Sequence, residues 1–531
     1  MTVTATMVRT PEQLEAPPER TSLLRKLGPG VLEAAAGGSV AIAFTWLCMF
    51  IRVNPMTRIG QVSGLAALQL RFLLAFVVIA LVWAGLSRWV SRPVALRLAC
   101  GSLAGLATGL YAGGIAVILT GTPWPLNGTR GDSGQLQRWV DDILNGRPIS
   151  GVYPPLFPHL LAYWTEIFNP GRPGAALKIL GLLLIAFTGP AVYLAWRLVL
   201  PPLWALGIGV ISVFPIVHAA KPYVDVALLI LIPVLAKFIA SLLASPGRSR
   251  RAALLTGAGY GVAIAGLFLW YSGWFVWSAP GVFACLALTL AKVGRQGRDA
   301  LLRVAILLGA TATAFLLLSG SYLGRLLSGS DTPDTYMYFD TATDPAYFAM
   351  WQGDQPGAFA DSAWPLPGEL GGVGVFMLLL IAGLGVALWL GSSVPVVQLA
   401  ALCMLGALGL RYWFASHMER DQLVQLYPRT SAELLYCGII LCGMAAYLLS
   451  QKVLAQRAAA DGAPRPVAGP ALRTSGAVLC ALAFFFASAG SSTVDRFMPA
   501  NQHSWGLFGW TAQTTPLPDG KCPKFAPDGK C

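Results

Sequence analysis

The sequence predicts an all-α protein that crosses a membrane many times. Hydrophobic residues make up 56% of its 531 residues and charged residues only 11%, whereas about a quarter of the residues in soluble domains are charged. Long apolar runs recur along the chain, and most approach the length of about 20 residues that a membrane-spanning helix needs. These observations exclude a soluble enzyme, a disordered chain and a small disulfide-stabilised scaffold.

Window reading predicts about 13 membrane-spanning segments. Residues 1–28 precede them as a polar tail without a cleavable signal peptide, which we expect in the cytoplasm. We expect residues 29–490 to form one transmembrane domain with outer loops. The expected spans are 29–51, 66–87, 97–121, 176–199, 201–219, 223–245, 252–271, 274–291, 301–325, 370–390, 394–412, 432–450 and 474–490.

Basic residues predict the orientation of these spans. They gather in four short connections, which follow the second, sixth, eighth and twelfth spans. The positive-inside rule places such connections in the cytoplasm. One alternating path satisfies all four, with the N-terminus inside and the C-terminus outside the cytoplasmic membrane. The net charge of +13 then reflects membrane topology, so we expect membrane lipids and no nucleic acid as partners.

The same orientation places the long loops outside the cell. These are about 122–175, 326–369 and 413–431, together with the tail 491–531. Most of the acidic residues lie in them, so any chemistry is expected on the outer face. The sequence has neither a Walker A loop nor a Rossmann fingerprint, which disfavours ATP-driven transport.

The first outer loop carries the candidate catalytic residue. Asp132 follows Gly131 shortly after the third span, and an amphipathic stretch begins at Gln135. Sugar transfer from a lipid phosphate needs a general base that accepts the proton of the acceptor hydroxyl, and Asp132 lies where such a base is needed. The alternative is an N-cap aspartate that starts a surface helix. Asp141 and Asp142 are expected on the solvated face of that helix.

Basic residues of the outer segments are candidates for binding a phosphate, because guanidinium groups match phosphate oxygens bidentately. Asp225 follows one of them closely and is placed to pair with it or to orient it. The alternatives are an interfacial lysine and arginines that anchor anionic lipid headgroups. The candidates are Lys221, Arg411, His417, Arg420 and Arg429.

Aromatic residues near the outer surface, one of them close to a carboxylate, are candidates for binding a sugar or an acceptor. Aromatic rings offer flat apolar faces to a sugar, and carboxylates accept hydrogen bonds from hydroxyl groups. The alternatives are an aromatic belt at the membrane interface and an ordinary packed loop. The candidates are Tyr153, Trp270, Tyr338, Asp340 and Trp351.

The nine cysteines divide between the spans and the tail. Seven lie within expected spans, where a buried apolar role explains them. Cys522 and Cys531 lie in the outer tail, where an oxidising environment favours a disulfide over two free thiols. A zinc site needs more ligands than this tail supplies, and no cluster elsewhere has ligand spacing. We therefore expect no metal site and no bound cofactor.

Several stretches, in this order, resemble the membrane arabinofuranosyltransferases of actinobacterial cell walls, which belong to the GT-C superfamily. The resemblance is strongest to the galactan arabinofuranosyltransferases that place the first arabinose on galactan. The matching stretches are Gly131-Asp132, Tyr153-Pro154-Pro155, Thr335-Tyr336-Met337-Tyr338-Phe339-Asp340, Trp351 with Asp354, Arg411-Tyr412-Trp413-Phe414-Ala415-Ser416, Gln425-Leu426-Tyr427-Pro428-Arg429, and Asp495-Arg496-Phe497-Met498-Pro499 with Cys522 and Cys531.

The resemblance implies a GT-C fold, a polyprenyl-phosphate donor such as decaprenyl-phosphoryl-arabinofuranose, and an inverting single displacement. It assigns the role of general base to Asp132 and makes the basic residues candidates for the donor phosphate. The family's enzymes carry a sizeable globular domain after the last span, whereas only residues 491–531 follow it here. The acceptor is therefore either a galactan-like glycan or a smaller hydrophobic molecule.

Other functions remain open at this stage. A mannosyltransferase or another enzyme that uses a polyprenyl-phosphate sugar has the same needs. A lipid or sugar transporter predicts ionisable residues within the spans, whereas nearly all charges here lie at span ends or in loops. A scaffold for assembly predicts that Asp132→Asn and Arg429→Ala leave function intact.

Overall fold

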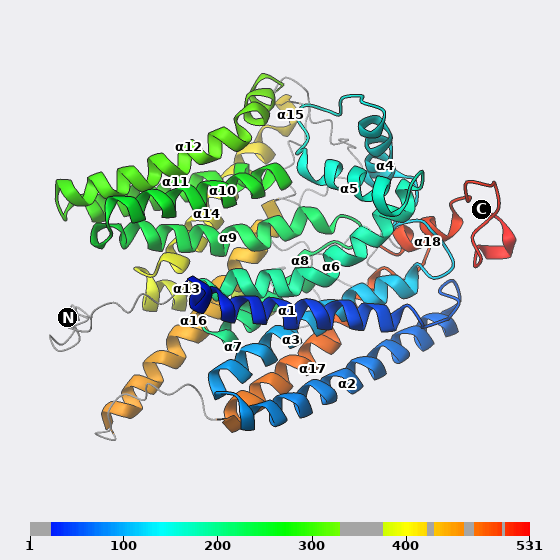
Figure 1. Ribbon diagram of the computed structural model, residues 1–531, viewed down its shortest axis with the longest axis horizontal. Coiled ribbons are helices and arrows are strands. Elements are labelled where there is room, and N and C mark those ends of the chain that lie inside the picture. Colours follow the sequence, from blue (N-terminus) through cyan, green and yellow to red (C-terminus); the bar gives the residue numbers. More distant parts are fainter. Residues whose placement is uncertain (1–22, 330–374, 422–429, 461–471, 502–504) are drawn as a thin grey trace.

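A computed structural model of the protein describes residues 23–329, 375–421, 430–460, 472–501 and 505–531, and every regular element in these ranges is a helix (Figure 1). The long helices are α1 (Leu23–Cys48), α2 (Arg58–Trp89), α3 (Arg92–Ile118), α6 (Pro173–Arg197), α9 (Pro222–Leu243), α10 (Arg250–Trp270), α11 (Gly273–Gly294), α12 (Arg298–Ser328), α14 (Pro395–Ser416), α16 (Thr430–Ala460) and α17 (Leu472–Arg496).

Shorter helices connect the long ones or follow them. They are α4 (Gly131–Leu144), α5 (Leu156–Phe168), α7 (Pro202–Ala205), the π-helix η2 (Leu206–Val210), α8 (Val213–Ile216), the 3₁₀ turn η3 (Ser245–Gly247), α13 (Val375–Gly391), α15 (Met418–Asp421), α18 (Gly506–Thr514) and the 3₁₀ turn η8 (Pro527–Gly529).

Eleven helices in the described ranges are long and apolar enough to cross a membrane. The expected all-α, multi-pass membrane architecture is therefore confirmed. Many large apolar side chains on these helices are exposed, such as Leu81 on α2 and Leu317 on α12. Exposed apolar surface of this kind is what a lipid environment accommodates.

Two of the expected spans differ from these eleven. Over residues 201–219 the chain forms α7, the π-helix η2 and α8, so the apolar helix runs only from Pro202 to Ile216. At 1.5 Å per residue this segment is about 22 Å long, short of the bilayer core of about 30 Å. Pro215 lies within α8, where proline removes a backbone donor. The expected span 370–390 becomes α13, and its residues 370–374 lie outside the described ranges.

Helix α3 lies at the centre of one half of the protein, packed against α1, α2, α6 and α17. Small residues allow the closest of these approaches. A Cβ atom on Gly105 of α3 would lie 2.0 Å from the carbonyl oxygen of Gly37 on α1. Helices in membranes often associate through such small residues, because their backbones can then make extensive contact. A larger residue at Gly105 would push α1 away.

The other half pairs α10 with α12, α11 with α14, and α13 with α16, and α9 contacts α6 as well as α10, α11 and α14. In Figure 1, α10, α11 and α12 lie across the top and α1, α2 and α17 lie below, with α6 and α9 between them.

Three basic connections and the short helices α4, α5 and α18 lie at opposite ends of the bundle. The connections between α2 and α3, α9 and α10, and α11 and α12 lie at the left in Figure 1, the side of the N-terminus. Helices α4, α5 and α18 lie toward the other end, with the C-terminus. Three of the four basic connections thus share one end and the first outer loop lies at the opposite end, as one alternating path requires. The fourth, between α16 and α17, includes residues outside the described ranges. Which end faces the cytoplasm stays a prediction of the positive-inside rule.

Candidate functional site

The turn before α4 fixes the position of Asp132. Gly128 and Gly131 have positive φ angles of 58° and 51°, a conformation that glycine adopts without steric penalty. The Ser133 hydroxyl donates to the Leu126 carbonyl at 2.8 Å, and the Gln137 amide donates to the Gly128 carbonyl at 2.9 Å. These bonds tie the first turns of α4 to the preceding loop, so Asp132 in the first turn has a defined place.

Asp132 forms an ion pair with Lys221, the residue that precedes α9. The two side chains are partly accessible, with exposed fractions of 48% for Asp132 and 36% for Lys221. The positive end of the α4 dipole also favours a carboxylate in its first turn. The structure therefore holds a carboxylate in place at the end of the bundle while leaving it open to a ligand.

The loop that presents Lys221 is held from both sides. Asp225, in the first turn of α9, accepts a hydrogen bond from the His218 backbone N–H at 2.8 Å. The His218 ring nitrogen Nδ1 accepts one from the Ala220 N–H at 3.3 Å. Burial lowers the pKa of His218 to about 4, so the ring is neutral near pH 7. The ring packs against the aromatic rings of Phe497, Trp505 and Phe508.

The aromatic candidates Tyr153 and Trp270 meet at Tyr223, two residues after Lys221. The hydroxyl groups of Tyr153 and Tyr223 are 2.6 Å apart, and the Trp270 indole N–H donates to the Tyr223 carbonyl at 2.8 Å. Phe157 stacks on Tyr223 with ring centroids 4.0 Å apart. Trp139 of α4 contacts Tyr153 with centroids 4.4 Å apart, so this aromatic cluster joins α4, α5 and α9.

The tail after α17 supports the first outer loop, a role that the sequence analysis missed. The Gln513 amide, fully buried on α18, donates to the carbonyls of Ile118 and Thr120, both at 2.9 Å. The Thr122 hydroxyl donates to the Ala512 carbonyl at 3.0 Å, and the Asn127 N–H donates to the Phe508 carbonyl at 2.9 Å. The apolar, glycine-containing run over Gly506–Thr514 is the sequence signal for this helix.

The end of the tail is also tied to the same loop. The Lys524 N–H donates to the Gly121 carbonyl at 3.2 Å. Cys522 and Cys531 form a disulfide that closes the chain end beyond this contact. Among the described residues, no group of three or more His, Cys, Asp or Glu side chains is arranged to hold a metal ion.

The other phosphate candidates that the structure describes, Arg411, His417 and Arg420, all have partners within the protein. Arg411 is fully buried and donates to the hydroxyls of Thr430 at 3.0 Å and Ser431 at 2.7 Å. His417 contacts the Trp413 ring, and its Nδ1 lies 2.7 Å from the Trp413 carbonyl oxygen. Arg420 is exposed and pairs with the adjacent Asp421 at 2.7 Å. Four candidates lie outside the described residues: Arg429, Tyr338, Asp340 and Trp351.

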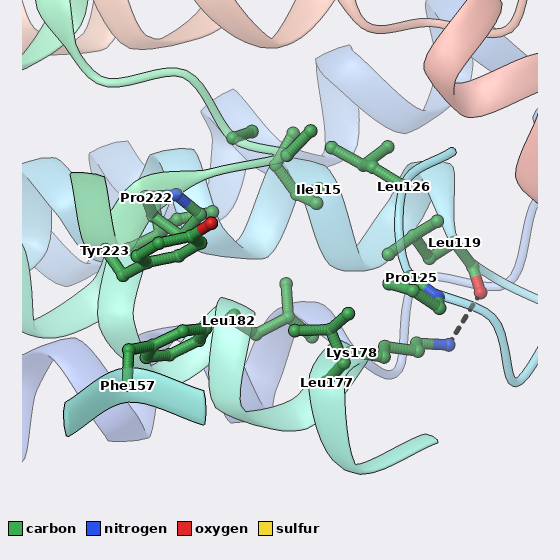
Figure 2. Close-up of a pocket in the computed structure, with 14 residues that line it drawn as sticks. Ile115, Leu119, Pro125, Leu126, Phe157, Leu177, Lys178, Leu182, Pro222 and Tyr223 are labelled. Atoms are coloured by element: carbon green, nitrogen blue, oxygen red, sulfur yellow. Dashed lines mark hydrogen bonds between the residues drawn. The ribbon is translucent and has the colours of Figure 1, made fainter. Parts of the chain in front are cut away.

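A small cavity lies under the first outer loop (Figure 2). Its volume of about 20 Å³ is close to the space of a single water molecule. Apolar side chains line most of it, and Figure 2 shows Phe157 and Tyr223 at one side and Lys178 at the other. The Lys178 ammonium donates to the carbonyls of Leu119 at 2.8 Å and Thr122 at 2.6 Å, at the end of α3. This cavity is too small for a sugar.

A larger cavity of about 500 Å³ is lined in part by Tyr153. It is bounded by the connection between α4 and α5 and by Arg325 near the end of α12. Its volume falls in the range of about 300–1,000 Å³ that is usual for small-molecule sites. Tyr153 thus links the neighbourhood of Lys221 with a space large enough for a ligand.

The sequence matches no protein-family model and no curated protein.

Proposed function

We propose that the protein is a membrane glycosyltransferase of the GT-C type. In this proposal it moves arabinofuranose from a polyprenyl phosphate, such as decaprenyl-phosphoryl-arabinofuranose, to a hydroxyl group of an acceptor outside the cytoplasmic membrane. The observation that carries the proposal is the accessible ion pair between Asp132 and Lys221 at the end of the helix bundle. The resemblance of the outer segments to the arabinofuranosyltransferases supplies the donor and the sugar.

The proposed mechanism is a single displacement with inversion. Asp132 accepts the proton of the acceptor hydroxyl while the hydroxyl oxygen forms its bond to the anomeric carbon, and the bond between that carbon and the phosphate oxygen breaks. The electron pair of the broken bond remains on the lipid phosphate. No nucleotide site is needed, because the lipid phosphate itself is the leaving group.

Lys221 has two roles in this proposal. Its ammonium group orients the Asp132 carboxylate in the absence of ligand, and it supplies positive charge beside the proposed base while the phosphate departs. Fixed positive charge at such a position stabilises the transition state more than the ground state. Its neighbours Asp225 and Tyr223 hold the start of α9 in place.

The acceptor is the less defined partner. The described part of the tail packs on the first outer loop through α18. We propose as acceptor either a galactan-like glycan or a smaller hydrophobic molecule, and the acceptor panel below distinguishes them.

The test uses the purified full-length chain with synthetic polyprenyl-phosphoryl-arabinofuranose and a panel of galactofuranosyl and hydrophobic acceptors, with products read by mass spectrometry. A mannosyl donor in parallel addresses the alternative sugar. We expect Asp132→Asn to lose about a hundredfold or more of the transfer rate, as removal of a general base does. Asp141→Asn is the matched control, because Asp141 is an exposed carboxylate on the same helix. Equal rates for both variants would refute the assignment of the base.

A further inference from the structure

The larger cavity beside Tyr153 is lined by basic side chains. Arg147 of the connection between α4 and α5, His159 of α5 and Arg325 of α12 all face it, and none of its described lining residues is acidic. Arg147 and His159 come from the first outer loop, and Arg325 comes from a distant part of the chain. A cavity of about 500 Å³ with this lining matches an anionic ligand.

These basic groups keep hydrogen-bonding capacity for a ligand. Arg147 pairs with Asp142 through its Nε at 2.8 Å, and its side chain is 61% exposed, so its terminal amino groups remain accessible. Arg325 is exposed and makes no ion pair within the described part of the chain. The His159 Nδ1–H donates to the Pro155 carbonyl oxygen at 2.7 Å, which fixes the ring and leaves Nε2 of the neutral ring as an acceptor for a ligand hydroxyl. Guanidinium groups prefer phosphate among the common anions of membranes.

An apolar face of α5 lies next to this cavity. Leu156, Leu160, Tyr163 and Ile167 are all exposed, and their spacing of four, three and four residues places them on one side of the helix. A short amphipathic helix of this kind lies in the interface of the bilayer, with its apolar side toward the acyl chains. Helix α5 lies at one end of a bundle of membrane-spanning helices. The bilayer itself is therefore the occupant that fits its apolar face.

We infer that the cavity between Arg147, His159 and Arg325 binds the phosphate head of a membrane lipid, with the lipid chain running along the apolar face of α5. The lipid reaches the cavity from the bilayer, and its phosphate receives hydrogen bonds from the two guanidinium groups. This site is separate from the basic residues that the sequence singles out, since Lys221, Arg411 and Arg420 have partners elsewhere. Tyr153 lines this cavity, and its hydroxyl lies 2.6 Å from the hydroxyl of Tyr223, two residues after Lys221.

Two kinds of membrane lipid carry the phosphate group that this site would bind. One is the polyprenyl-phosphate donor, in which case the site deepens the proposed function and rests on it. The other is an anionic phospholipid of the bilayer. The test therefore measures lipid binding without sugar or acceptor, so that a failure of binding and a failure of glycosyl transfer are separate results.

The experiment is native mass spectrometry of the purified full-length chain, titrated with polyprenyl phosphate, phosphatidic acid or phosphatidylcholine. We expect one molecule of polyprenyl phosphate or of phosphatidic acid to bind. Phosphatidylcholine should bind more weakly. Arg325→Gln should weaken this binding about tenfold, the usual loss for one charge-assisted hydrogen bond. Arg147→Gln, in an exposed connection, is a second variant with the same expectation. Arg138→Gln is the matched control, because Arg138 is exposed on α4 and does not line the cavity.

Two results support the inference and identify the source. Tighter binding of polyprenyl phosphate than of phosphatidic acid points to the sugar donor, and equal binding points to a bulk anionic lipid. The inference is overturned if both cavity variants bind phosphate lipids as tightly as Arg138→Gln does, with thermal unfolding midpoints equal to that of the wild type.

Discussion

Acidification should destabilise the protein through His218. The ring lies among Phe497, Trp505 and Phe508, and burial lowers its pKa from 6.5 to about 4. Between these two values the unfolded chain binds a proton that the folded chain excludes. The free energy of unfolding therefore falls as the pH is lowered from about 6.5 to about 4.

The size of this effect follows from the two pKa values. By linkage the loss is about 2 kcal/mol at pH 5 and about 3 kcal/mol once both states are protonated. Protonation would also remove Nδ1 as the acceptor for the Ala220 N–H. The surrounding rings attract an imidazolium by about 1 kcal/mol, which offsets part of the loss. We therefore expect a net loss of about 1–2 kcal/mol at pH 5.

The assay is thermal unfolding of the full-length chain in detergent at about pH 7 and about pH 5, the range in which histidine titrates. His218→Asn cannot be protonated there, and its side-chain oxygen can replace Nδ1 as the acceptor for Ala220. We expect the unfolding midpoint of the variant to fall by about 1–2 °C less than that of the wild type. His417→Asn controls for the substitution itself. An equal fall in the wild type and His218→Asn would show that burial does not exclude the proton from this ring.

Two further predictions concern the packing that supports the site. Gly105→Leu should lower the unfolding midpoint strongly and separate α1 from α3, because a Cβ atom at this position would lie 2.0 Å from the Gly37 carbonyl oxygen. Gly85→Leu on α2 is the control, because there is open space around Gly85. Gln513→Leu should destabilise the protein by about 1–3 kcal/mol, because the carbonyls of Ile118 and Thr120 lose their donor in a buried place. Chemical denaturation that gave equal midpoints for Gln513→Leu and the wild type would contradict this account.

The sequence predicted the helical membrane architecture because long apolar segments dictate spanning helices almost independently of their neighbours. It also predicted the amphipathic helix after Asp132, since the spacing of Leu136 and Val140 is a local signal. The interruption over 201–219 was missed, because a π-turn depends on packing as well as on composition.

The site was predictable only in part. Asp132 and Lys221 were each named from their positions in outer loops, but their ion pair joins segments far apart in the chain. No local pattern records which loops meet, so the sequence analysis considered only the nearby Asp225 as a residue that pairs with Lys221 or orients it. The basic cavity was missed for the same reason, because the fold brings Arg325 of α12 to Arg147 and His159 of the first outer loop, far away in the chain.

The contacts between the tail and the first outer loop also have a consequence for biosynthesis. The hydrogen bonds from Thr122 and Gln513 join residues separated by 390 and 395 positions. A ribosome extends the chain by about 5–20 residues each second. The first outer loop is therefore synthesised many seconds before α18, with which it forms these hydrogen bonds. During that interval the carbonyls of Ile118 and Thr120 lack the donor that they have in the finished protein. Helix α3 can therefore enter the membrane early, whereas Asp132 reaches its final setting only after α18 has crossed to the same side.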